Sequence, residues 1–548
     1  MRRSFAMLLA AFALIYIVGI MPLPLLEPDE GRYLSIPAEM LDSGDFVLPT
    51  INGIPYLEKP PLHYWLTASS LALFGRHPWA GRVWPMLLTF LTALLIFYFV
   101  RREISILAAE VSTVLYLSSL YSLCLSRINT IDEVFGFFVT ATVLCGYLFL
   151  EHKEKRFLYG FWAAAALGFL SKGLAVGVLA GGALLVYSVA TRRYFLWTRL
   201  FSLLPLLLFV VIVAPWLIAV ECKLPGSLQF FIIKEHFARF LTTVHKRDGP
   251  LYYFLPILAA GVIPWLGAFV PLFRKKFLEL LRNRGFLLAL CWFGFVFVFF
   301  SVSSSKLPTY LTPCWAALCI VLGTAVASAE EGGFISGVLG ALGCFAVATA
   351  MVMGPTEEVA KFGKPYEELA SGFIFFAGAA LAGAAGFASL RRASFLKSLV
   401  PTALFLALAL DVFCFAMSPI LRATRSSEPI GEIINGISSG PLEDTVIARY
   451  NVELQGLTFL TGRRFLIVDT PGELEFGIGK LPEEEKKRVY ATREEFGLLW
   501  KSAQRVLAIM KVERQEEFEA SFGAGRLLGR NARYIALLNR GPSVPRSE

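Results

Sequence analysis

Long apolar runs recur from residue 5 to about residue 420, and they constrain the fold more than any other feature of this chain. About twenty mostly apolar residues are needed to cross the hydrocarbon core of a bilayer. Of the 548 residues, 56% are hydrophobic and only 17% are charged, unlike a typical soluble domain. We therefore predict an integral membrane protein. The sequence contains thirteen candidate spans, which begin near Phe5, Val83, Ile104, Asp132, Phe157, Gly173, Leu200, Leu251, Phe286, Leu307, Gly333, Ser371 and Phe395.

Basic residues in the short loops predict the orientation of these spans, because cytoplasmic loops carry an excess of Lys and Arg. With the N-terminus inside, the inner loops hold most of the basic clusters, at 2–3, 101–102, 153–156, 192–199, 274–276 and 391–392. The inner loop "EEGG" at 330–333 is an exception. The first apolar run lacks a small-residue cleavage site, which favours an uncleaved span over a signal peptide. We predict a cytoplasmic N-terminus and a C-terminus on the outer side.

The net charge of +9 does not indicate nucleic acid. Its Lys and Arg residues lie in short clusters between apolar runs rather than on one basic face. We predict a membrane partner and no nucleic-acid partner.

After the last span, the pattern changes to that of a small α/β domain. Short apolar segments separated by polar helical stretches predict strands within "DTVIARY", "RRFLIVDT", "RVLAIMKV" and "ARYIALLNR". Thr492 and Glu495 have the spacing of a capping box and predict a helix start. The segment "GAGRLLG" at 523–529 lacks dinucleotide-binding spacing, and we predict a loop there. The chain is thus divided into a membrane domain at 1–420 and an α/β domain at 421–548.

Polar residues gather on the predicted outer side of the membrane. Four segments fall there: residues 27–66, the acidic pair Asp132 and Glu133, residues 234–250 and residues 303–313. Any one of them alone is equally consistent with a solvated loop. Their occurrence on one side predicts that the functional site lies at that face.

The first outer loop has two candidate functional positions. Asp29 is predicted to cap a short interfacial helix that Pro37 kinks and that ends at "SGD", residues 43–45. Its carboxylate serves as a cap only, or else faces a substrate that enters from the membrane. Lys59 precedes two prolines that stiffen the backbone, so it is either a dedicated phosphate ligand or a side chain extending to ordinary lipid headgroups.

Several segments together resemble one family, the integral-membrane glycosyltransferases that use polyprenyl-phosphate sugars. Within it, the chain is similar to the branch of aminoarabinose transferases that modify lipid A, although protein mannosyltransferases share the Asp-Glu loop. The segments that carry the resemblance are "PDEGRYLSIPAEML", "SGDF", "NGIPYLEKPPLHYWLTA", "SRINTIDEVFGFF", "EHFARFLTTVHKRDGPLYYF", "SSSKLPTYLTPCWAAL" and "FLTGRRFLIVDTPGELEFG".

The resemblance implies a mostly α-helical membrane fold of the GT-C type. It would have about thirteen transmembrane helices, interfacial helices in the first outer loop and a small soluble α/β domain at the C-terminus. It also implies a bacterial inner-membrane enzyme with its active site and C-terminal domain in the periplasm. The implied reaction is inverting transfer of a sugar, 4-amino-4-deoxy-L-arabinose, from undecaprenyl phosphate to lipid A or a related envelope acceptor.

Carried over by position, the resemblance assigns site residues. Lys59 and Tyr310 match positions that hold the donor phosphate, with Arg239 or Lys246 assisting. Tyr310 also suits an interfacial aromatic belt. The remaining assignments are Asp29 and Asp132 as catalytic carboxylates, Arg32 and Glu58 as substrate-binding residues, and Lys306 as a phosphate ligand or an interfacial anchor.

The role of the carboxylates depends on the acceptor. A hydroxyl of a protein or glycan is a poor nucleophile and needs a general base such as Asp29. A lipid A phosphate, with a second pKa of about 6, is already largely ionised at neutral pH. With that acceptor, a carboxylate orients the acceptor or binds the sugar amine. Transfer of a hexose to a protein or glycan hydroxyl is the alternative reaction.

A metal and a transporter are the remaining alternatives. Glu58, His236 and His245 would share an ion only if their loops meet, and no cofactor is predicted to be required. A lipid-linked sugar transporter would need charged residues along a path through the midplane. The spans are almost uncharged, with Asp411 as the exception, so we favour an enzyme.

Overall fold

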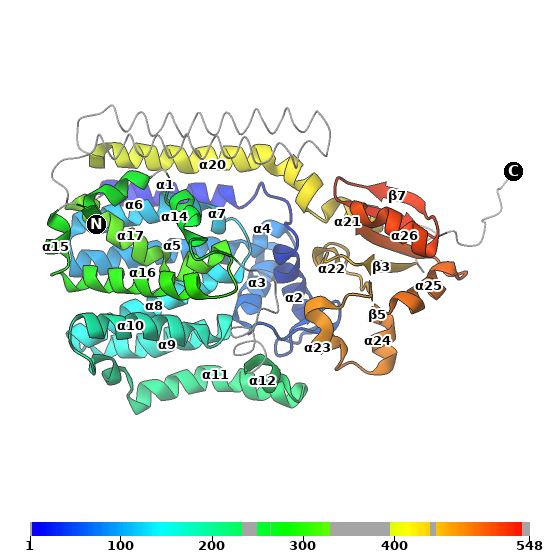
Figure 1. The fold of residues 1–548 in the computed structure, drawn as a ribbon, viewed down its shortest axis with the longest axis horizontal. Helices are drawn as coiled ribbons and strands as arrows, with labels where there is room; N and C mark the ends of the chain where they lie inside the picture. Colours follow the sequence, from blue (N-terminus) through cyan, green and yellow to red (C-terminus); the bar gives the residue numbers. More distant parts are fainter. Residues whose placement is uncertain are drawn as a thin grey trace. The chain divides into compact units, whose positions relative to one another are not determined.

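The chain forms two compact units. The computed structural model describes residues 3–232, 249–263, 265–273, 275–328, 395–438 and 445–539. The helical unit comprises the described parts of 1–21, 82–360 and 367–416, and the sheet unit those of 22–81, 361–366 and 417–548 (Figure 1). The first long loop therefore groups with the C-terminal residues. The domain division at residue 420 stays a prediction.

The helical unit consists mainly of long apolar helices. Five helices in the described residues are long and apolar enough to cross a membrane, or up to seven if each bent pair counts as one span. The predicted spans near Gly333 and Ser371 lie outside the described residues, so the total of thirteen stays a prediction. The main helices are α1 (Arg3–Gly19), α5 (Val83–Glu103), α6 (Ile106–Ser118), α8 (Ile131–His152), α9 (Lys155–Lys172), α10 (Ala175–Ala190), α11 (Leu203–Lys223), α14 (Phe254–Val262), α16 (Arg284–Val302), α17 (Thr312–Ala327) and α20 (Phe395–Arg425), the last of which continues into the sheet unit.

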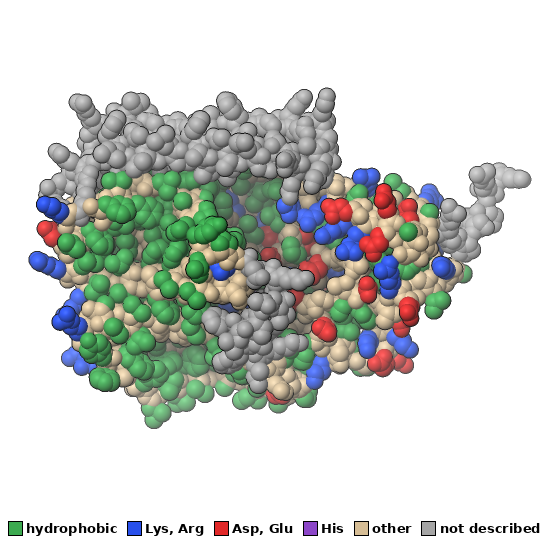
Figure 2. Space-filling view, viewed as in Figure 1, with side chains coloured by type: hydrophobic (Ala, Val, Ile, Leu, Met, Phe, Trp, Pro, Cys, Tyr) green, Lys and Arg blue, Asp and Glu red, His purple; other side chains and the backbone are tan. Residues whose placement is uncertain are grey.

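The surface of the helical unit matches a lipid environment. In Figure 2, hydrophobic side chains cover most of its visible face, and Lys and Arg gather at the end that carries α15 (Lys276–Leu280). Helix α11 exposes a continuous apolar surface, formed by Leu203, Leu204, Leu207, Val210, Val211 and Ile218. Large exposed apolar surfaces are unusual in soluble proteins. Here they indicate contact with acyl chains.

Helices α8 and α9 define the two ends of the helical unit. They form a hairpin, so the start of α8 and the end of α9 share one end, and the short turn between them marks the other. At 1.5 Å per residue, α8 separates these ends by about 33 Å. Residues predicted for the outer side, such as Asp132, therefore lie a bilayer's thickness away from the "KEKR" turn at 153–156.

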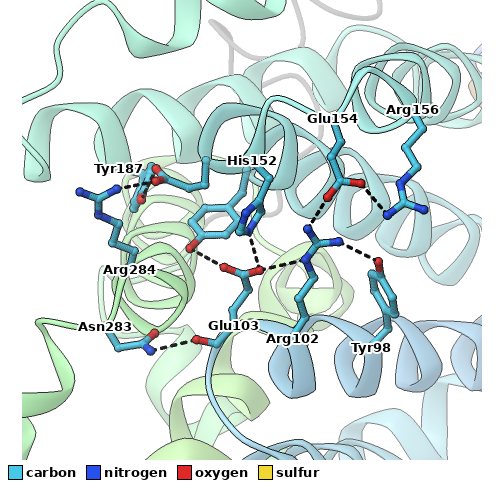
Figure 3. Close-up of polar contacts among 11 residues, drawn as sticks. Tyr98, Arg102, Glu103, His152, Glu154, Arg156, Tyr187, Asn283 and Arg284 are labelled. Atoms are coloured by element: carbon cyan, nitrogen blue, oxygen red, sulfur yellow. Dashed lines mark hydrogen bonds and ion pairs between the residues drawn. The ribbon is translucent and has the colours of Figure 1, made fainter.

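A polar network ties four helix ends together at the turn end of this hairpin. Figure 3 shows Glu103, the last residue of α5, beside His152 and Arg102. Its carboxylate lies 2.8 Å from Nε2 of His152 and 3.4 Å from Nε of Arg102. Arg102 also pairs with Glu154 at the start of α9, and Asn283 before α16 donates to the Glu103 carbonyl at 3.0 Å. Two of the loops predicted to be cytoplasmic, at 101–102 and 153–156, thus meet in one charged cluster.

A buried ion pair lies inside the helical unit. Arg127 donates from Nε to Oδ1 of Asp411 at 2.9 Å and also bonds it through Nη2. Both side chains are almost fully buried, 1% and 8% exposed, and the Arg127 guanidinium lies 5.3 Å from the Tyr16 ring centre. The isolated charge in the last predicted span is therefore explained by a partner, since intramembrane charges are normally paired.

The sheet unit is built on a six-stranded sheet of order β5-β4-β3-β6-β8-β7. Strands β5, β4, β3 and β6 are parallel, and β8 and β7 extend the sheet antiparallel. The strands are β3 (Val446–Tyr450), β4 (Leu466–Val468), β5 (Tyr490–Ala491), β6 (Val506–Lys511), β7 (Arg526–Arg530) and β8 (Tyr534–Leu538). Strands β3, β4, β6 and β8 confirm the four predicted apolar segments.

Helices cover both faces of this sheet. Alternate residues of β6 point to opposite sides, as strand geometry requires: Ala508 and Met510 pack with α25 (Arg493–Lys501) and α26 (Gln515–Phe522). Leu507 and Ile509 pack on the other face with α21 (Glu428–Ser438) and α22 (Gly456–Thr461). Burial on both faces explains why the parallel strands are apolar throughout rather than alternating.

Two local predictions in this unit have definite outcomes. The capping box is confirmed, because Thr492 and Glu495 exchange side-chain and backbone hydrogen bonds at the start of α25. The predicted loop at 523–529 is wrong, since residues 526–530 form the edge strand β7. A register shift between Leu527 and Gly529 interrupts its pairing with β8, and this irregular, exposed strand has no alternating pattern to reveal it.

The first long loop is bound to the sheet unit through a hairpin. Strands β1 (Thr50–Ile51) and β2 (Ile54–Pro55) are joined by Asn52 and Gly53, whose φ angles of 59° and 72° suit a two-residue turn. The Asn52 amide donates to the Phe465 carbonyl at 2.8 Å and accepts from the Phe465 N–H at 2.6 Å. One side chain thus pairs with the backbone next to β4.

Helix α2 (Asp29–Ser43) precedes this hairpin and corrects one prediction. Asp29 is not the N-cap: Pro28 occupies that position, and no side chain caps the helix. The predicted end is confirmed, because α2 stops at Ser43 and Gly44 adopts a left-handed φ of 69°. Pro37 lies inside the helix. Asp29 is instead the first residue of the helix.

The Arg127–Asp411 pair gives a stability prediction. Asp411→Asn should lower the stability of the detergent-solubilised protein by about 3–5 kcal/mol, because it leaves a buried guanidinium uncompensated. The double variant Arg127→Leu with Asp411→Leu should lose less, since it removes both charges. Thermal melting of the three proteins tests this, and additive losses in the double variant would contradict a coupled pair.

Candidate functional site

Arg32 is the centre of a polar cluster in the sheet unit. Its Nη1 lies 2.7 Å from Oε2 of Glu473 and donates to the Tyr56 hydroxyl at 3.2 Å. Tyr56 in turn donates to Glu473 at 3.1 Å. Helix α2, the hairpin and the turn at η5 (Gly472–Leu474) thus each contribute one group. Burial raises the pKa of Tyr56, so its hydroxyl remains a donor.

Asp29, Glu58 and Lys59 lie in the same unit. The Asp29 carboxylate is 62% exposed and lies 3.7 Å from Nη2 of Arg32. Glu58 is buried, and its Oε2 lies 3.8 Å from Nζ of Lys59, which also donates to the Glu58 carbonyl at 3.0 Å. The structure therefore links the predicted residues as two pairs, Asp29 with Arg32 and Glu58 with Lys59.

His63 forms an aromatic cluster with Tyr33 and Tyr64 in the same unit. The His63 ring packs edge-on against Tyr33, with centroids 4.9 Å apart, and near Tyr64 at 6.2 Å. Burial lowers its pKa to about 3, so the ring is neutral. Neither ring nitrogen has a hydrogen-bond partner among the described residues. Because His63 is neutral, it adds no positive charge to that of Arg32 and Lys59.

Glu27 anchors the start of α2. Its Oε1 accepts from the Ser427 hydroxyl at 2.6 Å and from the Gly456 N–H at 2.9 Å. Burial raises its pKa to about 7, against the opposing charges of Arg449 and Arg32. Burial also lowers the pKa of Arg449 to about 10. The residue two positions before Asp29 is thus held by segments 400 and 429 residues later in the chain.

A second cluster lies in the helical unit. Asp132 in the first turn of α8 accepts from Nζ of Lys172, the last residue of α9, at 2.5 Å. The same ammonium lies 5.2 Å from the Tyr310 ring centre and 5.5 Å from that of Phe135. Lys172 therefore brings the predicted catalytic Asp132 and the predicted phosphate ligand Tyr310 together. Ring contacts of this kind hold a cation without neutralising it.

The other predicted residues have different positions. Glu133 is buried in the helical unit and accepts from the Thr89 hydroxyl at 2.9 Å. Lys306 is 6% exposed, and its Nζ donates to the Ser303 carbonyl at 2.6 Å. Its ammonium is therefore held close to the turn before η4 (Pro308–Leu311) rather than extended into solvent. Arg239 and Lys246 lie outside the described residues.

The arrangement suits an anionic substrate more than a metal. Lys172 and Lys59 are partly accessible cations, 22% and 16% exposed, each held by a neighbouring carboxylate. In the described part of the chain, no three His, Cys, Asp or Glu residues are grouped as metal ligands. Two members of the predicted metal set, His236 and His245, lie outside it. Cations set against aromatic rings are suited to a phosphate that enters from the membrane.

Sequence reasoning missed three residues of these clusters. Lys172 looked like an isolated loop cation, although "SKG" marked the turn on which it lies. Glu473 is separated from Arg32 by over 400 residues, so no local pattern connects them. His63 is separated from the Pro-Pro pair by Leu62 and belongs to no motif that marks it as functional.

Comparison with known proteins covers both units. Residues 58–218 match the family model of dolichyl-phosphate-mannose-protein mannosyltransferase, and residues 440–539 match that of the aminoarabinose transferase C-terminal domain. An undecaprenyl phosphate-α-4-amino-4-deoxy-L-arabinose arabinosyl transferase of Yersinia pestis (strain Pestoides F) is 30% identical over 410 residues, which are 71% of this chain and 72% of the relative. The like-named protein of Edwardsiella ictaluri is 34% identical over 321 residues, and this match spans 57% of each chain.

A solved structure extends the similarity to the whole chain. The crystal structure of ArnT from Cupriavidus metallidurans bound to undecaprenyl phosphate has a TM-score of 0.84 and 27% identity. The match covers 99% of this chain and 100% of that one.

The raised pKa of Glu27 gives a pH prediction. Below pH 4.5 the carboxyl is protonated in both folded and unfolded chains. Between about 4.5 and 7 only the folded state keeps the proton, so stability falls as the pH rises through this window. The loss is on the order of 3 kcal/mol. Glu27→Gln keeps both accepted hydrogen bonds but cannot titrate. It should therefore remove this decrease in stability between about pH 4.5 and pH 7.

Thermal midpoints of the solubilised protein at pH 5 and pH 8 measure this effect. The exposed residue Glu484, changed to Gln, is the matched control and should leave the difference between the two midpoints as in the wild type. An unchanged pH difference in Glu27→Gln would show that another group carries the titration.

Proposed function

Because the chain belongs to the family of undecaprenyl phosphate-α-4-amino-4-deoxy-L-arabinose arabinosyl transferases, we propose that it transfers 4-amino-4-deoxy-L-arabinose from undecaprenyl phosphate to lipid A. The observation that carries this proposal is the similarity over 99% of the chain to ArnT, a protein crystallised with undecaprenyl phosphate. Lys59 and Lys172, each beside a carboxylate, are cations that suit an anionic donor. The acceptor on this proposal is a lipid A phosphate or a related envelope group.

In the sheet unit, Lys59 is the residue assigned to the donor phosphate. In the helical unit, Tyr310 is the assigned phosphate ligand, and Lys172 adds positive charge beside its ring. Arg239 assists from the segment 234–250, and Lys306 retains N–H groups beyond the one given to Ser303. Placing such donors around the phosphate stabilises the charge that develops on it as the sugar leaves. Arg32 and Glu58 position the sugar beside this phosphate.

The reaction is an inverting displacement at the anomeric carbon. An oxygen of the acceptor forms the new bond to this carbon as the bond to the donor phosphate oxygen breaks, and undecaprenyl phosphate leaves with the electron pair. An ionised acceptor phosphate, whose second pKa is about 6, has no proton to give up. Asp29 and Asp132 then orient the acceptor and bind the sugar amine rather than remove a proton.

The proposed topology places this chemistry outside the cytoplasm. Thirteen spans with a cytoplasmic N-terminus bring Asp132, Lys172, Tyr310 and the α/β domain at 421–548 to the periplasmic side of the inner membrane. The charged network of Figure 3 then faces the cytoplasm. The separation of these two sets along α8 supports this assignment, because short inner loops carry the excess of basic residues.

A hydroxyl acceptor is the second candidate. It is favoured by the match of residues 58–218 to the protein mannosyltransferase family. In that reaction the acceptor must lose a proton, and Asp29, exposed beside Arg32, would be the base. The two reactions differ in how strongly they depend on Asp29.

Mass spectrometry of lipid A tests the proposed transfer. The host should make the aminoarabinose lipid donor but lack its own transferase. Expression of this chain should add an aminopentose to lipid A, and Lys59→Ala should reduce the product by about two orders of magnitude because a phosphate contact is lost. Lys487→Ala, an exposed lysine on α24 (Glu483–Val489), is the control and should retain the product. Unmodified lipid A, with expression and donor verified, would contradict the proposal.

Asp29→Asn separates the two acceptors. With a phosphate acceptor, the single-turnover rate at saturating donor should fall by roughly threefold to tenfold, because an orienting contact is lost but no proton is removed. With a hydroxyl acceptor, a fall of about a hundredfold or more is expected. Asp469→Asn, an exposed position in the sheet unit, is the control. An unchanged rate in Asp29→Asn would remove Asp29 from both mechanisms.

A further inference from the structure

The sheet unit contains a cavity of about 320 Å³, and none of the residues assigned to the transfer reaction lines it. One wall is the face of α2 that carries Glu39 and Asp42, and another is α22, which carries Thr458. Arg463 and Arg464 line it from the turn before β4. Its volume lies at the lower end of the range for small-molecule sites.

The acidic residues of this cavity already have partners. Glu39 accepts from the Thr50 hydroxyl at 2.8 Å, and from the N–H groups of Asn52 at 2.5 Å and Gly53 at 3.1 Å. Asp42 forms an ion pair with Arg76. Their charges are therefore largely satisfied within the protein.

Two cations of the cavity have no such partner. Within the described ranges, neither Arg463 nor Arg464 forms an ion pair or a side-chain hydrogen bond. Arg464 is held against the hairpin turn, because a Cβ built on Gly53 would lie 2.6 Å from its guanidinium carbon. Two adjacent guanidinium groups thus line one wall of the cavity. Arg464 also acts electrostatically on Glu39 across the cavity, where its charge opposes the rise in pKa that burial causes in that carboxyl.

The Thr458 hydroxyl is a second, independent observation. Thr458 is 7% exposed, and its Oγ1 has no hydrogen-bond partner among the described residues, although it lines the cavity. Buried polar side chains are nearly always hydrogen-bonded. A ligand with oxygen atoms would satisfy this hydroxyl and the two arginines together.

We propose that this cavity binds a phosphorylated sugar. Guanidinium groups bind phosphate oxygens through paired hydrogen bonds, and the carboxylate of Asp42, 58% exposed, can accept from sugar hydroxyls. The volume accommodates a monosaccharide phosphate rather than a larger glycan. The ligand is either a soluble sugar phosphate or the phosphorylated sugar headgroup of a glycolipid.

Calorimetric titration of the full-length protein in detergent tests this site with glucose 1-phosphate, glucose and inorganic phosphate. Glucose 1-phosphate should bind, with glucose and inorganic phosphate each about tenfold weaker or more. The double variant Arg463→Gln with Arg464→Gln should weaken the binding of glucose 1-phosphate by about tenfold or more. Lys487→Gln with Arg488→Gln removes two exposed charges on α24 and should leave binding unchanged.

Thr458→Val keeps the shape of the cavity and both arginines, so it tests the site even if the double variant fails to fold. This substitution should weaken the binding of glucose 1-phosphate by roughly threefold to tenfold, the loss of affinity expected for one hydrogen bond. Unaltered affinity in Thr458→Val and in a folded arginine variant would overturn the proposal. Equal affinity for inorganic phosphate and glucose 1-phosphate would overturn the assignment to a sugar.

A second arm distinguishes the two sources of the ligand. The same proteins are titrated with bisphosphorylated and with dephosphorylated lipid A in mixed micelles. If the Arg463 and Arg464 substitutions weaken the binding of bisphosphorylated lipid A more than the control substitutions do, the ligand is a glycolipid headgroup. An effect on glucose 1-phosphate alone supports a soluble ligand. No effect in either arm overturns the site, whether or not the chain transfers a sugar.

Discussion

The attachment of the first long loop to the C-terminal sheet determines where the functional groups of the sheet unit lie. A single buried carboxylate, Glu27, joins the start of α2 to Ser427 and to the backbone of Gly456. The Asn52 amide joins the hairpin to Phe465. Arg32, Glu58 and Lys59 lie on the stretch between these two attachments or just after it. Their geometry therefore depends on residues that the chain supplies only near its end.

Each unit combines a cation, a carboxylate and an aromatic ring, but the combination is reached differently. In the helical unit, Lys172 and Asp132 come from the facing ends of two consecutive helices, so a hairpin is enough to pair them. In the sheet unit, Arg32 and Glu473 are brought together by tertiary contacts alone. In both units a carboxylate keeps the cation in place. The side chain of Lys172 remains 22% exposed, whereas Arg32 is buried. This combination is suited to hold an anion.

Much of the fold follows from periodicity and loop charge. Apolar runs located the helices that the structure describes, and the four buried strands were evident because strands covered on both faces are apolar throughout. Edge strand β7 was missed because its exposed, irregular residues carry no such pattern. Asp29 was assigned as a cap because local sequence resembles a cap, whereas the adjacent Pro28 occupies that position. Pairings such as Arg127 with Asp411 were inaccessible, since no local rule connects distant charges.

The two partners of the Arg127–Asp411 pair are synthesised at different times. Arg127 enters the membrane 284 residues ahead of Asp411, so the early helices are inserted while their buried guanidinium still lacks its carboxylate. The first loop likewise waits for the strands that bind it. A chain that is cut short before α20 therefore retains the guanidinium of Arg127 without the carboxylate that pairs with it in the folded protein.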